Sequence, residues 1–202
     1  MIGPEDILEF WFGDLPFGHE TPAALRARWW KKDPALDAEI EERFGAALLA
    51  AAAGELDGWT ETLRGTLALI ILLDQFTRNT RRDTAAMYAN DAQALDLTRL
   101  FLDLEGAEQL HPDMRMFAVM PLMHSESVLD QERCVAFAER LAAELAAGGP
   151  PYAGYLEGFV KYAIVHREIV AQWGRFPHRN KILGRDSTPE EVEFLKTPGS
   201  SF

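Results

Sequence analysis

The sequence predicts an all-α protein, and two observations support this. Alanine and leucine dominate the 202 residues, whereas the β-branched residues that favour strands are sparse. Apolar residues recur at the three- and four-residue spacing of amphipathic helices, and no alternating stretch lies between hairpin turns. About eight helices joined mostly by short loops predict antiparallel helix pairs stacked on one another, in a single domain over residues 1–202.

Proline, aspartate and glycine mark the ends of the first three predicted helices. Pro4 lies in the first turn of the first helix, which Gly13 ends. A second helix is predicted to start at Thr21-Pro22. Asp33 is the predicted N-cap of the third helix, because its carboxylate can accept free amide hydrogens of the first turn, and Gly54 ends this helix.

The fourth predicted helix begins after Gly58-Trp59 and ends near Phe76. It is apolar on so many sides that we expect it to be central. A short helix follows at Thr84–Tyr88. The pattern Asn90-x-x-Gln93 then predicts a capping box at the start of a longer helix, which Gly106 closes.

A proline interrupts the next predicted helix, His111–Leu122. Pro121 should end or kink it, because proline lacks an amide hydrogen and clashes with the preceding turn. Ser125 or Ser127 then caps a new helix, the latter in the pattern Ser127-x-x-Asp130.

Glycine and proline separate the last two long helices. Gly148–Pro151 is a predicted loop. The final long helix is expected over about Tyr152–Trp173, with Gly174 just beyond its C-terminus, where glycine readily adopts a left-handed conformation.

Composition narrows the classes of partner and site. The net charge of -12 disfavours attraction to polyphosphate or anionic lipid, so we expect no nucleic acid and no membrane partner. The start of the chain lacks a signal-peptide pattern, which predicts a cytoplasmic protein. The single cysteine, Cys134, excludes an internal disulfide and a cysteine-built zinc site, and we expect no cofactor.

The first polar segment of interest follows the most apolar helix. Asp74 is four residues after Ile70 and seven after Leu67, so helical geometry places its carboxylate on the same buried face. An unpaired buried charge costs several kcal/mol, so Asp74 needs a partner. Either Asp74 acts as a cap or pairs with an arginine for structural reasons, or it belongs with Arg78 and Asn79 to a site.

The second segment contains His124, Glu126, Asp130 and Gln131. Glu126 and Asp130 are four residues apart and are predicted to share a helix face, where two like charges need a nearby cation. That cation could be an arginine, a protonated His124 or a metal. The spacing matches none of the strong metal-ligand motifs, so we predict no metal site, and helix capping explains part of the segment.

The third segment, residues 175–185, carries four cations and a histidine but no acid, within a strongly acidic chain. Cations beyond a helix C-terminus can bond the open carbonyl groups and stabilise the helix dipole. Two arginines, each with a planar fork of donors, are also what recognition of a carboxylate or phosphate needs. The sequence leaves both interpretations open.

The chain resembles a bacterial family known as domain of unknown function 924. The resemblance covers nearly the whole chain and rests on Phe10-Trp11-Phe12-Gly13, Leu73-Asp74-Gln75-Phe76 with Arg78-Asn79, Pro121-Leu122 with His124-Ser125-Glu126 and Asp130-Gln131, Arg175-Phe176-Pro177-His178-Arg179-Asn180, and Leu183-Gly184-Arg185 with Ser187-Thr188. Thr77 departs from the proline that the family more often has. The resemblance implies a tetratricopeptide-like, right-handed stack of helix pairs and supplies no established activity.

These segments predict a polar groove that binds a small anionic ligand or a protein or peptide partner. Arg175, Arg179 and Arg78 would grip an anion; Asn79, Asn180 and Gln131 would orient it; Asp74, Glu126 and Asp130 would hold the arginines or contact a cationic end.

The alternative function is a hydrolase or lyase with His124 or His178 as general base and a carboxylate partner. An imidazole and a carboxylate within hydrogen-bond reach at an open pocket would favour this enzyme. Fully paired side chains would instead favour a structural network and a protein partner. The aromatic residues near the N-terminus could serve a homodimer interface as well as a core.

Overall fold

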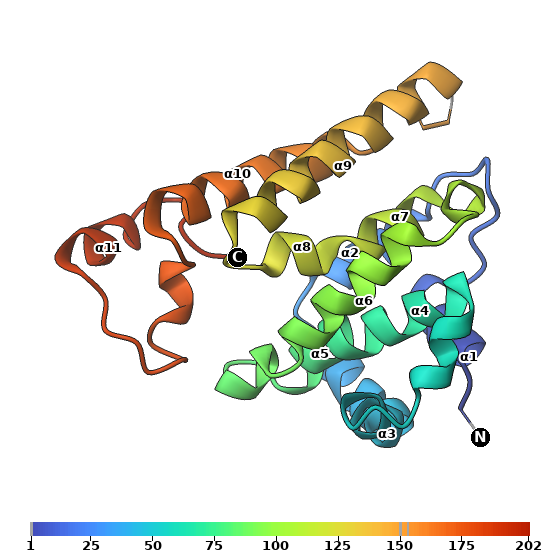
Figure 1. The fold of residues 1–202 in the computed structure, drawn as a ribbon, viewed down its shortest axis with the longest axis horizontal. Coiled ribbons are helices and arrows are strands. Elements are labelled where there is room, and N and C mark those ends of the chain that lie inside the picture. Colours follow the sequence, from blue (N-terminus) through green and yellow to red (C-terminus); the bar gives the residue numbers. More distant parts are fainter. Residues whose placement is uncertain (1, 150, 153) are drawn as a thin grey trace.

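The computed structural model describes residues 2–149, 151–152 and 154–202, and within these ranges it contains helices and no strand (Figure 1). The all-α prediction is therefore confirmed. The finer prediction, a tetratricopeptide-like stack, stays a prediction. Among the described residues, no helix is both long enough and apolar enough to cross a membrane.

The α-helices follow one another in chain order. They are α1 (Pro4–Phe12), α2 (Ala23–Trp30), α3 (Pro34–Ala52), α4 (Leu63–Ile70), α5 (Thr77–Thr80), α6 (Asp91–Asp103), α7 (Pro112–Ala118), α8 (Met120–His124), α9 (Val128–Gly148), α10 (Glu157–Trp173) and α11 (Pro189–Phe194). The described residues also form four 3₁₀ turns and one π-helical turn. The 3₁₀ turns are η1 (Asp57–Glu61), η3 (Ala85–Tyr88), η4 (Ala107–Gln109) and η5 (Pro177–Arg179), and the π-helical turn is η2 (Ile71–Phe76).

The fold has a compact N-terminal set of helices and a long pair beside it. In Figure 1 the long helices α9 and α10 run alongside each other over one side of the molecule, and the last segment, with α11, extends beyond one end of that pair. Helix α4 packs against α1 and α6. Every residue from Gly65 to Phe76 is buried, which confirms that this stretch is central.

Aromatic side chains of the N-terminal helices contribute to the core. Trp11 and Phe12 are at most 1% exposed, and both contact Phe117 of α7 edge-on. Trp30, by contrast, is 58% exposed. The core interpretation of these aromatic residues is therefore confirmed for the buried ones, and the homodimer stays untested.

Several predicted helix ends are confirmed. Asp33 caps α3, and its Oδ1 accepts the amide hydrogen of Ala35 at 2.9 Å. Gly174 follows α10 with a φ of 67°, in the left-handed region that side chains with a Cβ rarely adopt. The interruption predicted from Pro121 is also present. Helix α7 ends at Ala118 and α8 begins at Met120, so the chain breaks where a continuous helix would bring the proline ring against a carbonyl group.

The fourth helix differs from its prediction in one important respect. Its last six residues, Ile71–Phe76, form a π-helical turn instead of continuing as an α-helix. The extra residue of a π turn rotates the side chains that follow it, and such turns frequently lie at functional sites. This turn contains Asp74 and Gln75.

The capping box predicted at residues 90–93 is wrong. Asn90 stands at the N-cap of α6, but its side-chain amide donates to Thr77 Oγ1 at 2.9 Å, and Gln93 donates to the carbonyl oxygen of Ala51 at 3.0 Å. Contacts with other helices have thus replaced the local cap.

The final long helix begins five residues later than predicted, at Glu157. Tyr152 and Tyr155 lie in turns, where their hydroxyl groups bond the backbone of His19 and Thr21 at 2.8 and 3.1 Å. These long-range bonds compete with helix formation. The predicted loop agrees with the end of α9 at Gly148, although Pro150 lies outside the described residues.

Helix α11 was not predicted. It begins with a capping box in which Thr188 and Glu191 each bond the other's backbone amide. The pattern Thr188-Pro189-Glu190-Glu191 carries this signal in the sequence.

Candidate functional site

The π-helical turn holds a fully buried carboxylate. Asp74 is 0% exposed, and its Oδ1 lies 2.7 Å from Nδ1 of His124, the last residue of α8. Nη1 of Arg78 lies 3.0 Å from the same oxygen, and Nε2 of Gln75 donates to Oδ2 at 2.6 Å. The predicted need of Asp74 for a partner is thus met by an arginine and an imidazole together.

The surroundings set the charges of this group. Burial alone would raise the pKa of Asp74, but the charge of Arg78 and the contact with His124 outweigh it and bring the pKa to about 2. Burial and the positive charge of Arg78 lower the pKa of His124 below 6.5, against the opposing effect of Asp74. His124 is therefore neutral at pH 7, and Asp74 is ionised.

Arg78 is bound by two carboxylates. Besides Asp74, it meets Asp91, the first residue of α6, through Nη1–Oδ1 and Nη2–Oδ2 hydrogen bonds of 2.8 and 3.1 Å. The neighbouring Asn79 donates to Asp37 at 2.7 Å. These contacts tie the turn to α3 and α6, so Arg78 and Asn79 position the site and are not among the residues that line its pocket.

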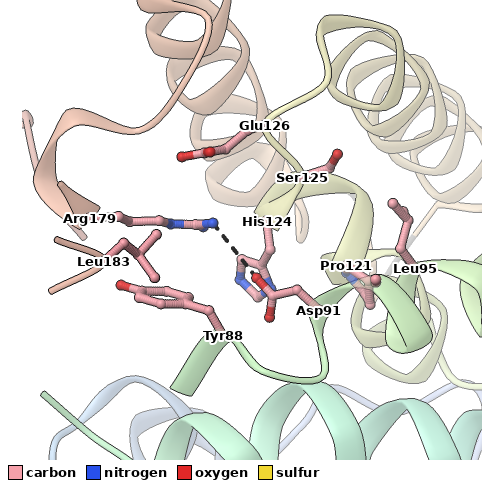
Figure 2. Close-up of a pocket in the computed structure, with 10 residues that line it drawn as sticks. Tyr88, Asp91, Leu95, Pro121, His124, Ser125, Glu126, Arg179 and Leu183 are labelled. Carbon is pink, nitrogen blue, oxygen red and sulfur yellow. Dashed lines mark ion pairs between the residues drawn. The ribbon is translucent and has the colours of Figure 1, made fainter. Parts of the chain in front are cut away.

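A pocket of about 350 Å³ opens beside His124 (Figure 2). It lies between η3 and α6 on one side, the end of α8 on a second and the segment around η5 on a third. The lining residues are Tyr88, Asp91, Ala92, Leu95, Pro121, His124, Ser125, Glu126, Arg179 and Leu183. Three segments that are distant in the sequence therefore meet here: two of them are predicted segments, around His124 and Arg179, and the third, residues 88–95, was not predicted.

Arg179 supplies the pocket with a buried positive charge. Its side chain is 8% exposed and lies over the rings of Tyr88 and Phe176, at 4.7 and 4.4 Å from their centroids. Within the described part of the chain its side chain makes no hydrogen bond, and its one ion pair is a 3.7 Å contact with Asp91 Oδ2. Figure 2 shows the guanidinium group extending toward Asp91 and His124. Burial and the charge of Arg78 lower the pKa of Arg179.

Glu126 fastens the C-terminal segment to the pocket. Both of its oxygens accept from Arg185, at 2.6 and 2.9 Å, and Oε1 accepts the amide hydrogen of Phe176 at 2.8 Å. Burial alone would raise the pKa of Glu126, but the hydrogen bonds from Arg185 and Phe176 and the charge of Arg185 together outweigh it and lower the pKa. Because Phe176 immediately precedes η5, this anchoring fixes the segment that carries Arg179.

The prediction that Glu126 and Asp130 share a helix face is wrong. Helix α9 begins only at Val128, so Glu126 lies in the preceding turn, and each carboxylate has a different arginine. Asp130 lies 3.3 Å from Arg99 and accepts the hydroxyl hydrogen of Ser125 at 2.9 Å. Two cations on different parts of the chain therefore resolve the expected repulsion.

Two further predicted site residues form hydrogen bonds within the protein and do not line the pocket. Gln131 is fully buried and donates to the carbonyl oxygens of Met123 and Ser125, both at 2.6 Å. Asn180 donates to Ser187 Oγ and Glu191 Oε2, at 3.0 and 3.2 Å. Their contacts stabilise the two turns that border the pocket.

Arg175 and His178 also lie outside the pocket lining. Arg175 forms a two-point ion pair with Glu191, with donor–acceptor distances of 2.7 and 2.8 Å. His178 lies against Phe176 and Phe202, and burial together with Arg179 lowers its pKa to about 4. Of the two candidate bases, the geometry therefore favours His124.

Tyr88 and Asp91 are among the lining residues that the sequence did not predict. Tyr88 ends a 3₁₀ turn, and Asp91 stands at the first position of α6, where a carboxylate is common for reasons of helix stability. Neither has a motif of its own. No cluster of three or more histidine, cysteine, aspartate or glutamate side chains in the described ranges is arranged to hold a metal ion.

Comparison with known proteins gives two matches. A family model described as a bacterial protein of unknown function (DUF924) matches residues 7–199. A solved structure of a protein of unknown function from Agrobacterium tumefaciens is 37% identical, covers 96% of each chain and has a TM-score of 0.76. A search of curated proteins gives no match. The resemblance seen in the sequence is thereby confirmed.

Proposed function

We propose that this chain, which belongs to the DUF924 family of bacterial proteins, binds a small carboxylate-bearing ligand in the pocket beside His124. Arg179 is the anchor for the carboxylate. The observation that carries the proposal is a guanidinium group that is over nine-tenths buried, lines a pocket and makes no hydrogen bond within the described residues.

A buried arginine is normally satisfied by acceptors, because leaving the charged donors unpaired costs free energy. Arg78 follows this rule with two hydrogen bonds to Asp91, and the partly exposed Arg185 has two hydrogen bonds to Glu126. Arg179 has only aromatic faces and a 3.7 Å contact with Asp91 among the described residues. A ligand carboxylate on its planar donors would supply the missing two-point partner.

The charge balance favours a carboxylate over a phosphate. Asp74, Asp91 and Glu126 are matched by Arg78, Arg179 and Arg185, so the group is neutral before a ligand binds. A monoanion leaves one negative charge there, whereas a dianionic phosphate leaves two, close to the carboxylates that already line the pocket.

The remaining walls indicate the rest of the ligand. Ala92, Leu95, Pro121 and Leu183 contribute apolar surface, and Tyr88 contributes an aromatic ring. Binding pockets are commonly apolar with a few placed polar groups, and 350 Å³ is at the lower end of their usual size. The proposed ligand is therefore a small carboxylate with an apolar body.

Thermal unfolding of the purified protein tests the proposal. The probes are benzoate, 3-phenylpropionate, acetate, inorganic phosphate and phenyl phosphate. A ligand at about 100 times its dissociation constant stabilises by about 2.7 kcal/mol, or roughly 5 to 10 °C at this size. We expect the aryl carboxylates to raise the unfolding temperature most.

Two matched variants make the test specific. Arg179→Met should lose the carboxylate-induced shift, because the anchor is gone. Arg175→Met should keep the shift, even if it unfolds earlier, because Arg175 pairs with Glu191 away from the pocket lining. An equal shift in wild type and Arg179→Met contradicts the proposal, and a larger shift with phenyl phosphate contradicts the choice of carboxylate.

A further inference from the structure

The wall of the pocket beside Arg179 carries a pair of groups suited to proton transfer. His124 lines the pocket, and its Nδ1 lies 2.7 Å from the buried Oδ1 of Asp74. No described residue forms a hydrogen bond with Nε2. This nitrogen is also not fully buried, because it is absent from the fully buried polar atoms that lack a partner. Nε2 is therefore the ring nitrogen left to face the pocket.

Asp74 fixes both the orientation and the tautomer of this imidazole. The carboxylate is ionised, so it accepts a hydrogen from Nδ1, and the lone pair then stands on Nε2. Asp74 is itself held by Arg78 and Gln75. This chain of contacts gives a neutral imidazole whose free nitrogen is basic and whose ring cannot easily rotate, as general-base catalysis requires.

Among the described residues, no serine hydroxyl or cysteine thiol at the pocket is suited to act as a nucleophile. Ser125 is the aliphatic hydroxyl among the lining residues, and it donates to Asp130 at 2.9 Å. Cys134 is buried, and burial raises the pKa of its thiol to about 12. A base without a neighbouring protein nucleophile acts on water.

We infer that the protein hydrolyses an ester of a carboxylate-bearing small molecule, with His124 as general base and Asp74 as its positioning residue. This activity rests on the proposed function, because Arg179 would hold the substrate carboxylate while the ester carbonyl lies near Nε2. The substrate class is thus a half-ester, with one free carboxylate and one ester group separated by an apolar spacer.

The reaction balances without a further reactant. Nε2 of His124 takes a proton from water as the water oxygen bonds to the carbonyl carbon. The tetrahedral intermediate then collapses, the bond from carbon to the alcohol oxygen breaks, and the departing alkoxide takes the proton from the imidazolium. The products are a carboxylic acid and an alcohol, and His124 returns to its neutral form.

The test uses the half-esters of adipate, pimelate and suberate with 4-nitrophenol, because they differ only in the length of the apolar spacer between the free carboxylate and the ester. Release of 4-nitrophenol is followed with wild type, His124→Gln, Arg179→Met and His19→Gln. Exposed His19 is the control for unspecific reaction of histidine side chains. The ester 4-nitrophenyl hexanoate, which lacks the carboxylate, is the control for Arg179.

We expect hydrolysis of at least one half-ester by wild type and by His19→Gln, and a loss of about 100-fold or more in His124→Gln. The wild type should hydrolyse 4-nitrophenyl hexanoate more slowly than the half-esters, and Arg179→Met should remove that preference. No hydrolysis by wild type, or equal rates in wild type and His124→Gln, overturns the inference.

Two measurements separate this inference from the proposed function and from simple misfolding. His124→Gln should still show the rise in unfolding temperature with 3-phenylpropionate, because Arg179 is intact. If the wild type binds this ligand but hydrolyses no half-ester, the proposed function is retained and the hydrolytic activity is contradicted. Asp74→Asn should move the acid limb of the rate profile to lower pH, because His124 loses the charge that raises its pKa. An unchanged acid limb in a folded Asp74→Asn protein contradicts the positioning role.

Discussion

Two Arg–Asn pairs, Arg78-Asn79 and Arg179-Asn180, are far apart in the sequence and lie near the same site, but their arginines have different partners. Arg78 follows the π-helical turn and is bound by Asp74 and Asp91. Arg179 lies in a 3₁₀ turn, over two aromatic rings, with a 3.7 Å ion pair as its contact to an acid. The same residue pair thus completes a structural network in one region and, among the described residues, leaves an arginine without a hydrogen-bonded acid in the other.

The asparagines, unlike the arginines, behave alike. Asn79 donates to Asp37 and Asn180 to Ser187 and Glu191, so each ties its turn to a neighbouring element. A short sequence pattern therefore does not decide the role of each residue in it. The acids that the fold places opposite each arginine decide whether its charge is used for stability or remains available to a ligand.

The largest expected effect is on stability and belongs to the first pair. Arg78→Met should destabilise the protein by about 3–5 kcal/mol, because it leaves the buried Asp74 without its strongest partner. The free energy of unfolding in urea measures this loss. A loss under about 1 kcal/mol would show that Arg78 is no more structural than Arg179 and would remove the contrast between the two pairs.

Acid should destabilise the protein partly through a buried histidine close to the second pair, Arg179-Asn180. Burial lowers the pKa of His166, which lies beside Phe176, to about 3. Between pH 6.5 and pH 3 this histidine therefore binds a proton in the unfolded chain but not in the folded protein. The free energy of unfolding is therefore undiminished above pH 6.5, and proton binding by the unfolded chain lowers it by about 2 kcal/mol at pH 5. Asp74, with a pKa of about 2, stays ionised over that range.

Unfolding temperatures from pH 7 to pH 5 check this sensitivity. The variant His166→Phe should show a smaller decrease than wild type, because phenylalanine has no proton to gain on unfolding. Equal decreases in the two proteins would assign the acid sensitivity to other groups.

The asparagines should give intermediate and similar effects. Asn79→Ala and Asn180→Ala each remove donors to partly or fully buried acceptors, at a cost of about 1–3 kcal/mol. Urea unfolding of both variants measures the cost. A large loss in one and none in the other would mean that only one of the two turns depends on its asparagine.

The smallest expected effect on stability belongs to Arg179. In Arg179→Met, Asp91 keeps both hydrogen bonds from Arg78, so no carboxylate becomes unpaired. We expect a change in stability within about 1 kcal/mol, measured by the same unfolding curves. A loss as large as that of Arg78→Met would make Arg179 a structural residue and contradict the proposed anchor.

Much of the fold could be predicted, because helix boundaries depend on local chemistry. Asp33, Gly174 and Pro121 act on the backbone within one or two turns of their own position, and the structure confirms all three predictions. The π-helical turn at Ile71–Phe76 and the late start of α10 depend on contacts made elsewhere in the fold. Neither leaves a local pattern.

The site shows the same division between local and distant chemistry. His124 and Arg179 were predicted from unusual polar residues near helix ends, and both line the pocket. Arg175, equally prominent in the sequence, pairs with Glu191 of a helix that was not predicted. Tyr88 and Asp91 were missed, because their role arises only where η3 meets the C-terminal segment.

The most direct test of the central claim observes the two arginines separately. In a ¹⁵N-labelled protein, the Nε–H signals of Arg78 and Arg179 are assigned with the two methionine variants and followed during titration with 3-phenylpropionate. A carboxylate anchored by Arg179 should shift the Arg179 signal in a saturable way and leave that of Arg78 nearly unchanged. Saturable binding with no change at Arg179 would contradict the account.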